Sequence, residues 1–438
     1  MRDLLIVVMV VAGSLAALKR PWIGVMVWTW LSIMNPHRFA WGPAFDAPLA
    51  LTAAASTAIG FVFTRERESP FKGGAVTLLV MFMVWMTISW LFGLDVVYDY
   101  EQWKKIMKID VMIILALMLL HTQQHIMALA IVATMSLALI GVKGGIFTIT
   151  TGGNFHVWGP PGSFIEDNNE FALALVMTIP LLRLLQLQVS RPWLRHGLTA
   201  SMLLCAVSSL GSQSRGALIA ISAMSLYMWW RGKNKAAIGI LMLVVAVAMI
   251  GFMPQEWAER MTSIGNYEQD ASSMGRISAW WTAWNLAFHY PAGVGFSVAR
   301  PELFALYSPY PDSVHAAHSI YFQVLGNHGF IGLAIFLGMW IATWRTASAC
   351  IKTAAKVPDA KWCVDLGTMC QVSLVGYLVG GAFLSLSYFD LPYNILVLVV
   401  LTRQWLLRHA DAGAPAGAPG RRGEPAAPRR PVTLAAWN

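Results

Sequence analysis

The stretch that decides the fold is HIMALAIVATMSLALIGV, residues 125–142, which contains no Asp, Glu, Lys or Arg. An α-helix needs about 20 consecutive apolar residues to cross the hydrocarbon core of a membrane. Comparable runs recur from the first residues of the chain to about residue 407. A helix satisfies its own backbone hydrogen bonds in lipid, so these repeated runs predict an all-α integral membrane protein.

The composition agrees with a chain whose main solvent is the lipid bilayer. Only 12% of the 438 residues are charged and 57% are hydrophobic, whereas a soluble domain carries about 25% charged residues. The net charge of +9 does not indicate a nucleic-acid partner, because the charges are spread over many short loops. We therefore expect membrane lipids around the protein and no nucleic acid.

Hydropathy, turn residues and charges together predict about 12 transmembrane helices. We place the spans near residues 4–35, 47–64, 75–94, 106–121, 125–142, 170–187, 198–211, 215–231, 236–253, 318–345, 364–385 and 391–407. The first span is too long for one straight helix, and Lys19-Arg20-Pro21 divides it into two short halves or a hairpin. A large loop with short helices, residues 254–317, separates the spans at 236–253 and 318–345.

This pattern makes residues 1–410 one polytopic domain. Residues 411–438 are rich in Ala, Pro, Gly and Arg and lack apolar periodicity. Such a composition is typical of disordered segments. We therefore expect a disordered cytoplasmic tail.

Basic side chains gather in alternate loops and so predict the topology. By the positive-inside rule the loops that hold them are cytoplasmic. Their residues are Arg65, Arg67, Lys72, Arg191, Arg195, Arg231, Lys233, Lys235, Lys352, Lys356 and Lys361. The opposite face receives the loops 36–46, 95–105, 143–169, 212–214, 254–317 and 386–390. Lys104, Lys105 and Lys108 break this pattern, and an error in the placing of this span explains them better than a phosphate-facing cluster.

Two arginines on the non-cytoplasmic face are candidates for binding an anion. Arg215 follows Ser212-Gln213-Ser214 between two apolar spans, at the outer edge of the membrane. An arginine at hydrocarbon depth costs roughly 2.5–3.5 kcal/mol, so it needs a partner, a water-filled cavity or a lipid phosphate. Arg276 opens an amphipathic helix that carries Trp280, Trp281 and Trp284, and for these tryptophans an interfacial aromatic belt is the favoured interpretation. Guanidinium groups bind phosphate oxygens bidentately, which favours a phosphate-bearing ligand.

His318 is the candidate proton acceptor. It lies in His315-Ala316-Ala317-His318, where the large loop meets the next apolar span at headgroup level. Histidine is the usual residue for proton transfer near neutral pH. An isolated histidine in such a place is more often structural, but two arginine sites on the same face strengthen the catalytic interpretation. The few acidic residues on this face, among them Asp99, Glu101 and Glu166, lack the spacing of a metal site, so we expect no metal or other cofactor.

The order and spacing of these motifs resemble the O-antigen ligase/polymerase superfamily. They are S-x-S-R-G at 212–216, G-R-x-x-x-W at 275–280, P-x-G-V-G at 291–295 and H-S-x-Y-x-Q-x-L-x-x-x-G-x-x-G at 318–332. N-P-H-R at 35–38 and F-x-x-D-N-N-E-F-A at 164–172 resemble its ligase members. The resemblance covers most of the chain except the C-terminal tail. Two departures are Ser319, where the family usually has Asn, and Asn327-His328, where an acidic residue often precedes the glycine.

The resemblance implies a multi-pass glycosyltransferase of the Gram-negative inner membrane, with its active site facing the periplasm. Ligase members move O-antigen glycan from undecaprenyl diphosphate to a sugar hydroxyl of lipid A–core, which completes lipopolysaccharide. By position, His318 matches the proposed general base, and Arg215 and Arg276 match the diphosphate-binding arginines. Lys143 and Arg38 are taken as further diphosphate contacts, and we expect the reaction to need neither metal nor ATP. Candidate residues of the substrate cavity are Asp167, Asn168, Tyr321, His315 and Tyr388.

Three other functions stay open at this point. An O-antigen polymerase has overlapping motifs and uses a second lipid-linked repeat as acceptor. A protein O-oligosaccharyltransferase would glycosylate periplasmic proteins instead. A transporter or flippase of the lipid-linked glycan belongs to another class, but transporters tend to show inverted repeats and midplane sites, and here the candidate residues cluster at one face.

Overall fold

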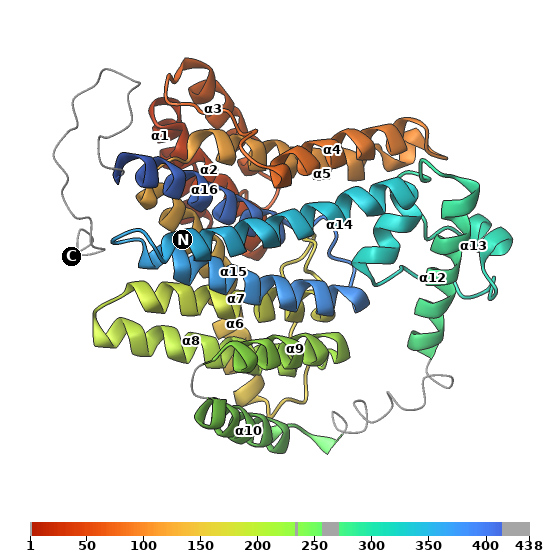
Figure 1. Cartoon of the computed structure of the whole chain (residues 1–438). Helices are drawn as coiled ribbons and strands as arrows, with labels where there is room; N and C mark the ends of the chain where they lie inside the picture. Colours follow the sequence, from red (N-terminus) through yellow and green to blue (C-terminus); the bar gives the residue numbers. More distant parts are fainter. Residues whose placement is uncertain (1, 233–234, 256–270, 414–438) are drawn as a thin grey trace.

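The computed structural model describes residues 2–232, 235–255 and 271–413, and every regular element in these ranges is a helix (Figure 1). The α-helices are α1 (Arg2–Lys19), α2 (Pro21–Met34), α3 (Leu49–Phe63), α4 (Gly74–Leu91), α5 (Val96–Leu119), α6 (Gln123–Thr150), α7 (Asn168–Gln188), α8 (Pro192–Gly211), α9 (Arg215–Arg231), α10 (Lys235–Phe252), α12 (Ala271–His289), α13 (Pro301–Tyr307), α14 (Ile320–Ala354), α15 (Lys361–Gly380) and α16 (Asp390–Gly413). Two short 3-10 helices are η1 (Pro36–Phe39) and η3 (Gly381–Phe383).

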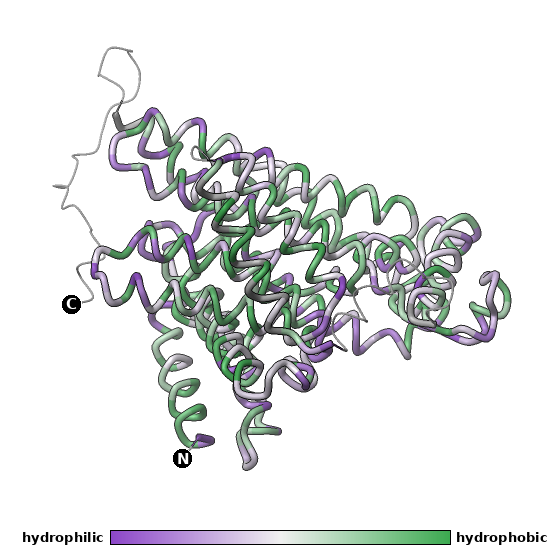
Figure 2. Tube along the Cα trace, turned by 90° about the horizontal axis from the view of Figure 1, so that it is seen from below, coloured by the Kyte–Doolittle hydropathy of each residue, from purple (hydrophilic) through white to green (hydrophobic). Residues whose placement is uncertain are grey.

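Five of the described helices are long and apolar enough to cross a membrane: α4, α6, α7, α14 and α15 extended to Phe383. The shorter helices α2 and α3 are also apolar. Hydrophobic residues predominate along the middle of the bundle, and hydrophilic residues gather toward the helix ends (Figure 2). These features fit an α-helical membrane protein, while the count of about 12 spans and the side on which residues 254–317 lie remain predictions.

The predicted stretch 4–35 is a helical hairpin. α1 ends at Lys19 and α2 begins at Pro21, because proline is well tolerated at the first position of a helix. A methyl group on Gly13 would lie 2.5 Å from Val27 Cγ2, and one on Gly24 would lie 2.8 Å from Ala17 Cβ. The two helices therefore run side by side in opposite directions, and α3 packs against both.

The predicted outer loop 95–105 is largely helical, and the predicted loop 143–169 is helical up to Thr150, which corrects the placing of both. α5 begins at Val96 because the Asp95 side chain accepts a hydrogen bond from the Tyr98 N–H at 2.9 Å. α6 continues past Lys143 to Thr150. The prediction ended this helix early because glycine weakens isolated helices. Close packing against α8 overrides that weakness, since a side chain on Gly145 would lie 2.2 Å from the Leu204 carbonyl oxygen.

The predicted span 318–345 begins at Ile320 and reaches Ala354, and it is interrupted at Gly329, where φ is 66°. The interruption frees the Asn327 carbonyl, which accepts hydrogen bonds from the Val294 and Gly295 N–H groups at 3.0 and 3.1 Å. The P-x-G-V-G motif at 291–295 thus packs onto the break in α14. α12 lies along α14 at this end of the bundle, with α13 beside it (Figure 1).

The last helix, α16, continues beyond the predicted span 391–407. α16 extends to Gly413, so the first residues of the expected tail 411–438 are helical. Residues 414–438 and, within the large loop, 256–270 lie outside the described residues, as does Lys233. The loop 254–317 contains α12 and α13 in its described part, as expected. α7 forms the centre of the bundle, and it packs against α6, α8, α9 and α15.

Candidate functional site

His318 lies immediately before α14 and faces Glu170 in the first turn of α7. Its Nδ1 is 3.5 Å from Glu170 Oε1, and the two side chains are 34% and 7% exposed, respectively. The carboxylate is therefore enclosed, whereas part of the imidazole is accessible. His318 has φ 40°, a left-handed conformation that is uncommon for a residue other than glycine. The backbone is thus bent at the residue that the sequence identified as the proton acceptor.

The first turn of α7 holds Glu170 in place. The Ser385 N–H donates to Glu170 Oε1 at 3.3 Å. Asp167 caps the helix by accepting a hydrogen bond from the Asn169 N–H at 2.8 Å. Burial alone would raise the pKa of Asp167, but interactions with the Glu170 side chain, hydrogen bonds from Asn169 and the nearby His318 outweigh it and lower this pKa. The helix N-terminus also favours negative charge, so this turn is suited to hold a carboxylate beside His318.

The turn between α8 and α9 brings Arg215 to the same region. Asn168 Nδ2 donates to the Ser212 carbonyl oxygen at 2.6 Å, which joins this turn to the start of α7. Ser214 caps α9 by accepting a hydrogen bond from the Ala217 N–H at 3.3 Å. A methyl group on Gly216 would lie 3.4 Å from Phe383 Cβ. Arg215, the first residue of α9, therefore lies beside the segment whose Ser385 binds Glu170.

α12 places Arg276 alongside the segment that leads to His318. A methyl group on Gly275 would lie 2.4 Å from His315 Cδ2, so the two residues are in close contact. One turn further on, Trp280 Nε1 donates to the Ala317 carbonyl oxygen at 2.7 Å. Arg276 lies between these two contacts. His315 is thus part of the packing that joins α12 to residues 315–318.

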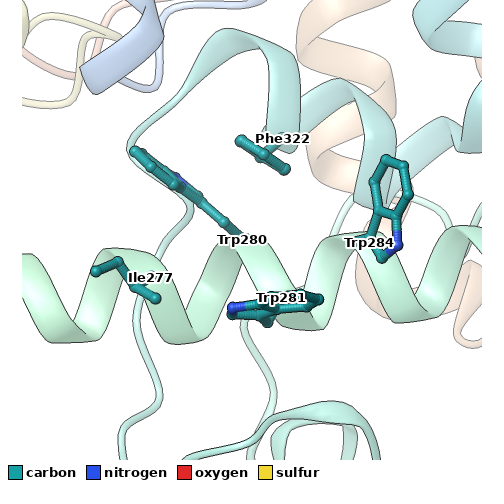
Figure 3. A pocket seen from close by; sticks show the side chains of 5 residues that line it. All are labelled: Ile277, Trp280, Trp281, Trp284 and Phe322. Atoms are coloured by element: carbon teal, nitrogen blue, oxygen red, sulfur yellow. The ribbon is translucent and has the colours of Figure 1, made fainter.

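An apolar groove adjoins this junction. Figure 3 shows its lining of Ile277, Trp280, Trp281, Trp284 and Phe322 around a cavity of about 350 Å³. Trp280 stacks on Phe322 with ring centroids 5.1 Å apart and planes 9° apart. Trp281 and Trp284 are 52% and 42% exposed. The three tryptophans therefore differ, since Trp280 is bonded to the loop before His318 while the other two form the open side of the groove.

Tyr321 and Tyr388 use their hydroxyl groups within the protein. The Tyr321 hydroxyl donates to the Leu378 carbonyl oxygen at 2.7 Å. Tyr388 is 3% exposed, and its hydroxyl lies 3.0 Å from Asn327 Nδ2 and 2.8 Å from His328 Nε2. Asn327 and His328 stand at one of the departures from the family pattern. The structure thus places Tyr388 in a buried cluster beside the break in α14, rather than beside His318.

Arg38 and Lys143 belong to a second group of cations, around η1 and the loop 160–166. Arg38 lies over the Phe45 ring at 4.8 Å, and Lys143 lies over the Phe39 ring at 5.8 Å. Lys105 Nζ approaches the Gly162 carbonyl oxygen at 3.4 Å. These residues come from η1, α5 and α6, which are other elements than those that surround His318.

The acidic residues weighed as metal ligands have structural partners. Asp99 is 1% exposed and accepts hydrogen bonds from the Phe296 N–H at 2.8 Å and from Arg300 at 3.4 Å. Glu101 pairs with Lys104 at 2.6 Å. Asp99 therefore fixes the loop that follows the P-x-G-V-G motif.

Two residues of this region were not singled out from the sequence: Glu170, which faces His318, and Ser385, whose N–H donates to Glu170. Glu170 was quoted only as part of the motif at 164–172, and Ser385 not at all. The signal for Glu170 was present, because an ionisable side chain in the first turn of an apolar helix is a functional candidate. No local pattern points to Ser385, which acts through its backbone N–H.

Two parts of the chain match known protein families. Residues 1–188 match a family of unknown function, DUF5935. No curated protein gives a significant match. A chain from a solved structure described as "Structural coordination of polymerization and crosslinking by a peptidoglycan synthase complex" is 16% identical, with a TM-score of 0.40 over 78% of this chain and 99% of the other. Residues 200–337, which include Arg215, Arg276 and His318, match the family model described as O-antigen ligase. This match supports membership of the O-antigen ligase superfamily for a chain whose apolar helices fit a multi-pass membrane protein.

Proposed function

We propose that the protein transfers a glycan from undecaprenyl diphosphate to a sugar hydroxyl of lipid A–core, on the periplasmic face of the inner membrane. One observation carries the proposal. His318 faces Glu170 at 3.5 Å, the first turn of α7 is hydrogen-bonded to the turn before Arg215, and α12, which carries Arg276, contacts residues 315 and 317. A candidate base with arginines on the elements that contact its surroundings suits a reaction that removes a proton and releases a diphosphate.

The proposed reaction is a single displacement at the sugar carbon C1. His318 accepts the proton of the acceptor hydroxyl while that oxygen forms a bond to C1. The bond between C1 and the phosphate oxygen breaks, and its electron pair leaves with undecaprenyl diphosphate. Proton removal by a positioned base contributes typically 10²–10⁴-fold in rate. Arg215 and Arg276 stabilise the negative charge that develops on the leaving diphosphate.

The sugar–diphosphate bond supplies the energy of transfer, so the proposal requires no nucleotide. The guanidinium groups can neutralise the leaving group, so it requires no metal ion either. The nearest alternative is O-antigen polymerase activity, in which the acceptor is a second lipid-linked repeat. The match at residues 200–337 supports glycosyl transfer of the ligase or polymerase type, and the acceptor distinguishes the two.

The test is transfer in vitro by the purified full-length chain, in EDTA and without ATP. The donor is an undecaprenyl-diphosphate-linked oligosaccharide, and the acceptor is rough lipopolysaccharide. We expect glycan on lipid A–core with the wild type, and at least 100-fold less with His318→Ala and with Arg215→Ala. The matched controls are His196→Ala and Arg191→Ala, whose side chains are exposed at the far end of α8, and both should retain wild-type activity.

Each other outcome changes the assignment. Transfer only between donor molecules would make the protein a polymerase. Glycan on periplasmic proteins, detected by mass spectrometry, would make it a protein O-oligosaccharyltransferase. Absence of transfer to every acceptor would favour a transporter of the lipid-linked glycan.

A further inference from the structure

Glu170 is a buried carboxylate whose position is fixed by its surroundings. It is 5% exposed. In the apolar stretch of its helix α7, 83% of the residues are buried. One carboxylate oxygen, Oε1, accepts a hydrogen bond from the Ser385 N–H and faces His318. The other, Oε2, is buried without a hydrogen-bond partner. Burying a carboxylate is costly unless it is paired, and His318 is the basic side chain that it faces.

The geometry also shows which nitrogen of the His318 imidazole faces Glu170. His318 Nδ1 is the atom that faces Glu170, at 3.5 Å, and it makes no hydrogen bond. A carboxylate at Nδ1 favours the tautomer with the proton on that nitrogen. Nε2 is then left unprotonated and available to accept a proton. The same logic operates when an aspartate orients a catalytic histidine in hydrolases.

We propose that Glu170 is a positioning residue for His318: it holds the imidazole with Nδ1 protonated and stabilises the imidazolium that forms when Nε2 takes the acceptor proton. This inference rests on the proposed function and names a residue through which its base acts. No bond to Glu170 forms or breaks, and the proton stays on the imidazole until product leaves.

The charged and titratable groups of this region come from several elements. Asp167 and Glu170 lie at the start of α7, Arg215 opens α9, and Arg276 lies on α12. His315 precedes His318 in its own segment. Among them Glu170 is the group whose side chain pairs with Nδ1, so its removal tests the inference directly.

The experiment compares Glu170→Gln with wild type in the transfer assay described above. Gln keeps the size of the side chain but lacks its charge, so kcat should fall about 10–100-fold while KM for donor and acceptor changes less than twofold. Glu170→Asp, which restores the carboxylate, should recover part of the lost kcat. Glu101→Gln, at a side chain that is 75% exposed, is the matched control and should be unaffected. Equal melting temperatures for Glu170→Gln and Glu101→Gln in detergent would show that both variants are folded.

A double-mutant cycle separates positioning from a general structural role. If Glu170 acts through His318, adding Glu170→Gln to His318→Ala should lower the residual rate no further. A further loss equal to that of the single variant, a rise in KM, or an unchanged kcat would overturn the inference. Activity that survives His318→Ala would instead contradict the proposed function, so the two failures are distinguishable.

Discussion

At the scale of single residues, Trp281 and Trp284 keep large apolar side chains exposed at the open side of the groove. Clusters of exposed aromatic side chains mark binding or membrane-contact surfaces. The groove adjoins the Trp280–Ala317 hydrogen bond. If the donor's diphosphate meets Arg276, as proposed, its first isoprene units would lie in this groove, and Trp281 would contact the lipid part of the donor rather than its glycan.

We expect Trp281→Ala to raise KM for an undecaprenyl donor about 5–30-fold, which corresponds to about 1–2 kcal/mol of lost apolar contact. A donor with a two-isoprene chain should be affected much less. Transfer rates measured with both donors check this, with Trp193→Ala, 65% exposed on α8, as control. Equal losses with both donors would show that the groove does not bind the lipid chain.

Candidate residues that stand in short local motifs were easier to find from the sequence than a residue defined by a distant contact. His318, Arg215 and Arg276 stand in short motifs at the edges of apolar spans, where a polar group needs a reason to be present. Glu170 was missed because its partner is far along the chain. Tyr388 was a candidate for the cavity because it lies at the last outer turn, although a structural role was at least as well supported. Its hydroxyl is in fact buried against Asn327 and His328.

At the scale of elements, the break in α14 packs against residues 291–295, and this contact depends on one glycine in each segment, Gly329 and Gly293. Gly329 has φ 66°, and a methyl group there would lie 2.2 Å from the Pro291 carbonyl oxygen. Gly293 has φ 88°, and a methyl group there would lie 2.1 Å from the Asn327 carbonyl oxygen. Both contacts are with backbone, which cannot rotate away. The spacing of these glycines in the motifs is therefore explained by packing.

We expect Gly329→Ala to destabilise the protein by about 1–3 kcal/mol, the usual cost of a strained backbone. Gly338→Ala in the same helix is the control, because its methyl group would meet Leu78 at an ordinary 3.6 Å. It should be neutral or slightly stabilising. Thermal unfolding in detergent compares the two, and similar melting temperatures would contradict the packing argument.

Apolar runs predicted most elements because their length and hydropathy are local properties. The predicted helix boundaries were wrong where packing or capping decides where a helix begins or ends. Lys143 lies within α6 because Gly144 and Gly145 allow α8 to approach, a contact that the sequence alone does not reveal. The choice between two halves and a hairpin at Lys19-Arg20-Pro21 likewise depended on the contact between Gly13 and Val27.

At the scale of the whole molecule, Glu68 connects parts of the chain that are distant in sequence. It pairs with Arg408 of α16 and with Lys72 at 2.6 Å. Arg408 also donates to the His121 carbonyl oxygen at 2.6 Å. The loop before α4, the residues before α6 and the last helix are thus held together at one end of the bundle.

Burial alone would raise the pKa of Glu68, but Lys72, Arg408 and His121 lower it below its usual value. The ion pairs therefore contribute stability at neutral pH, and that contribution is lost as the pH falls through the lowered pKa. We expect Glu68→Gln to reduce the melting temperature by about 1–3 °C at pH 7, and we expect this effect to shrink as the pH falls below the usual pKa of Glu, about 4.3, toward the lowered pKa of Glu68. Glu302→Gln, on the exposed surface of α13, is the control. A shift that stays the same as the pH falls would exclude the ion pairs as its cause.

The junction between the P-x-G-V-G motif and the break in α14 also bears on recombination of this gene with related ones. The Asn327 carbonyl accepts hydrogen bonds from the N–H groups of residues 294 and 295. Gly293 and Gly329 each lie so close to the opposite backbone that a side chain there would collide with it. A crossover between residues 296 and 326 would join halves from two parents whose backbones differ at this contact. Functional chimeras of related proteins should therefore inherit both halves from one parent, and crossovers elsewhere in the large loop should be tolerated better.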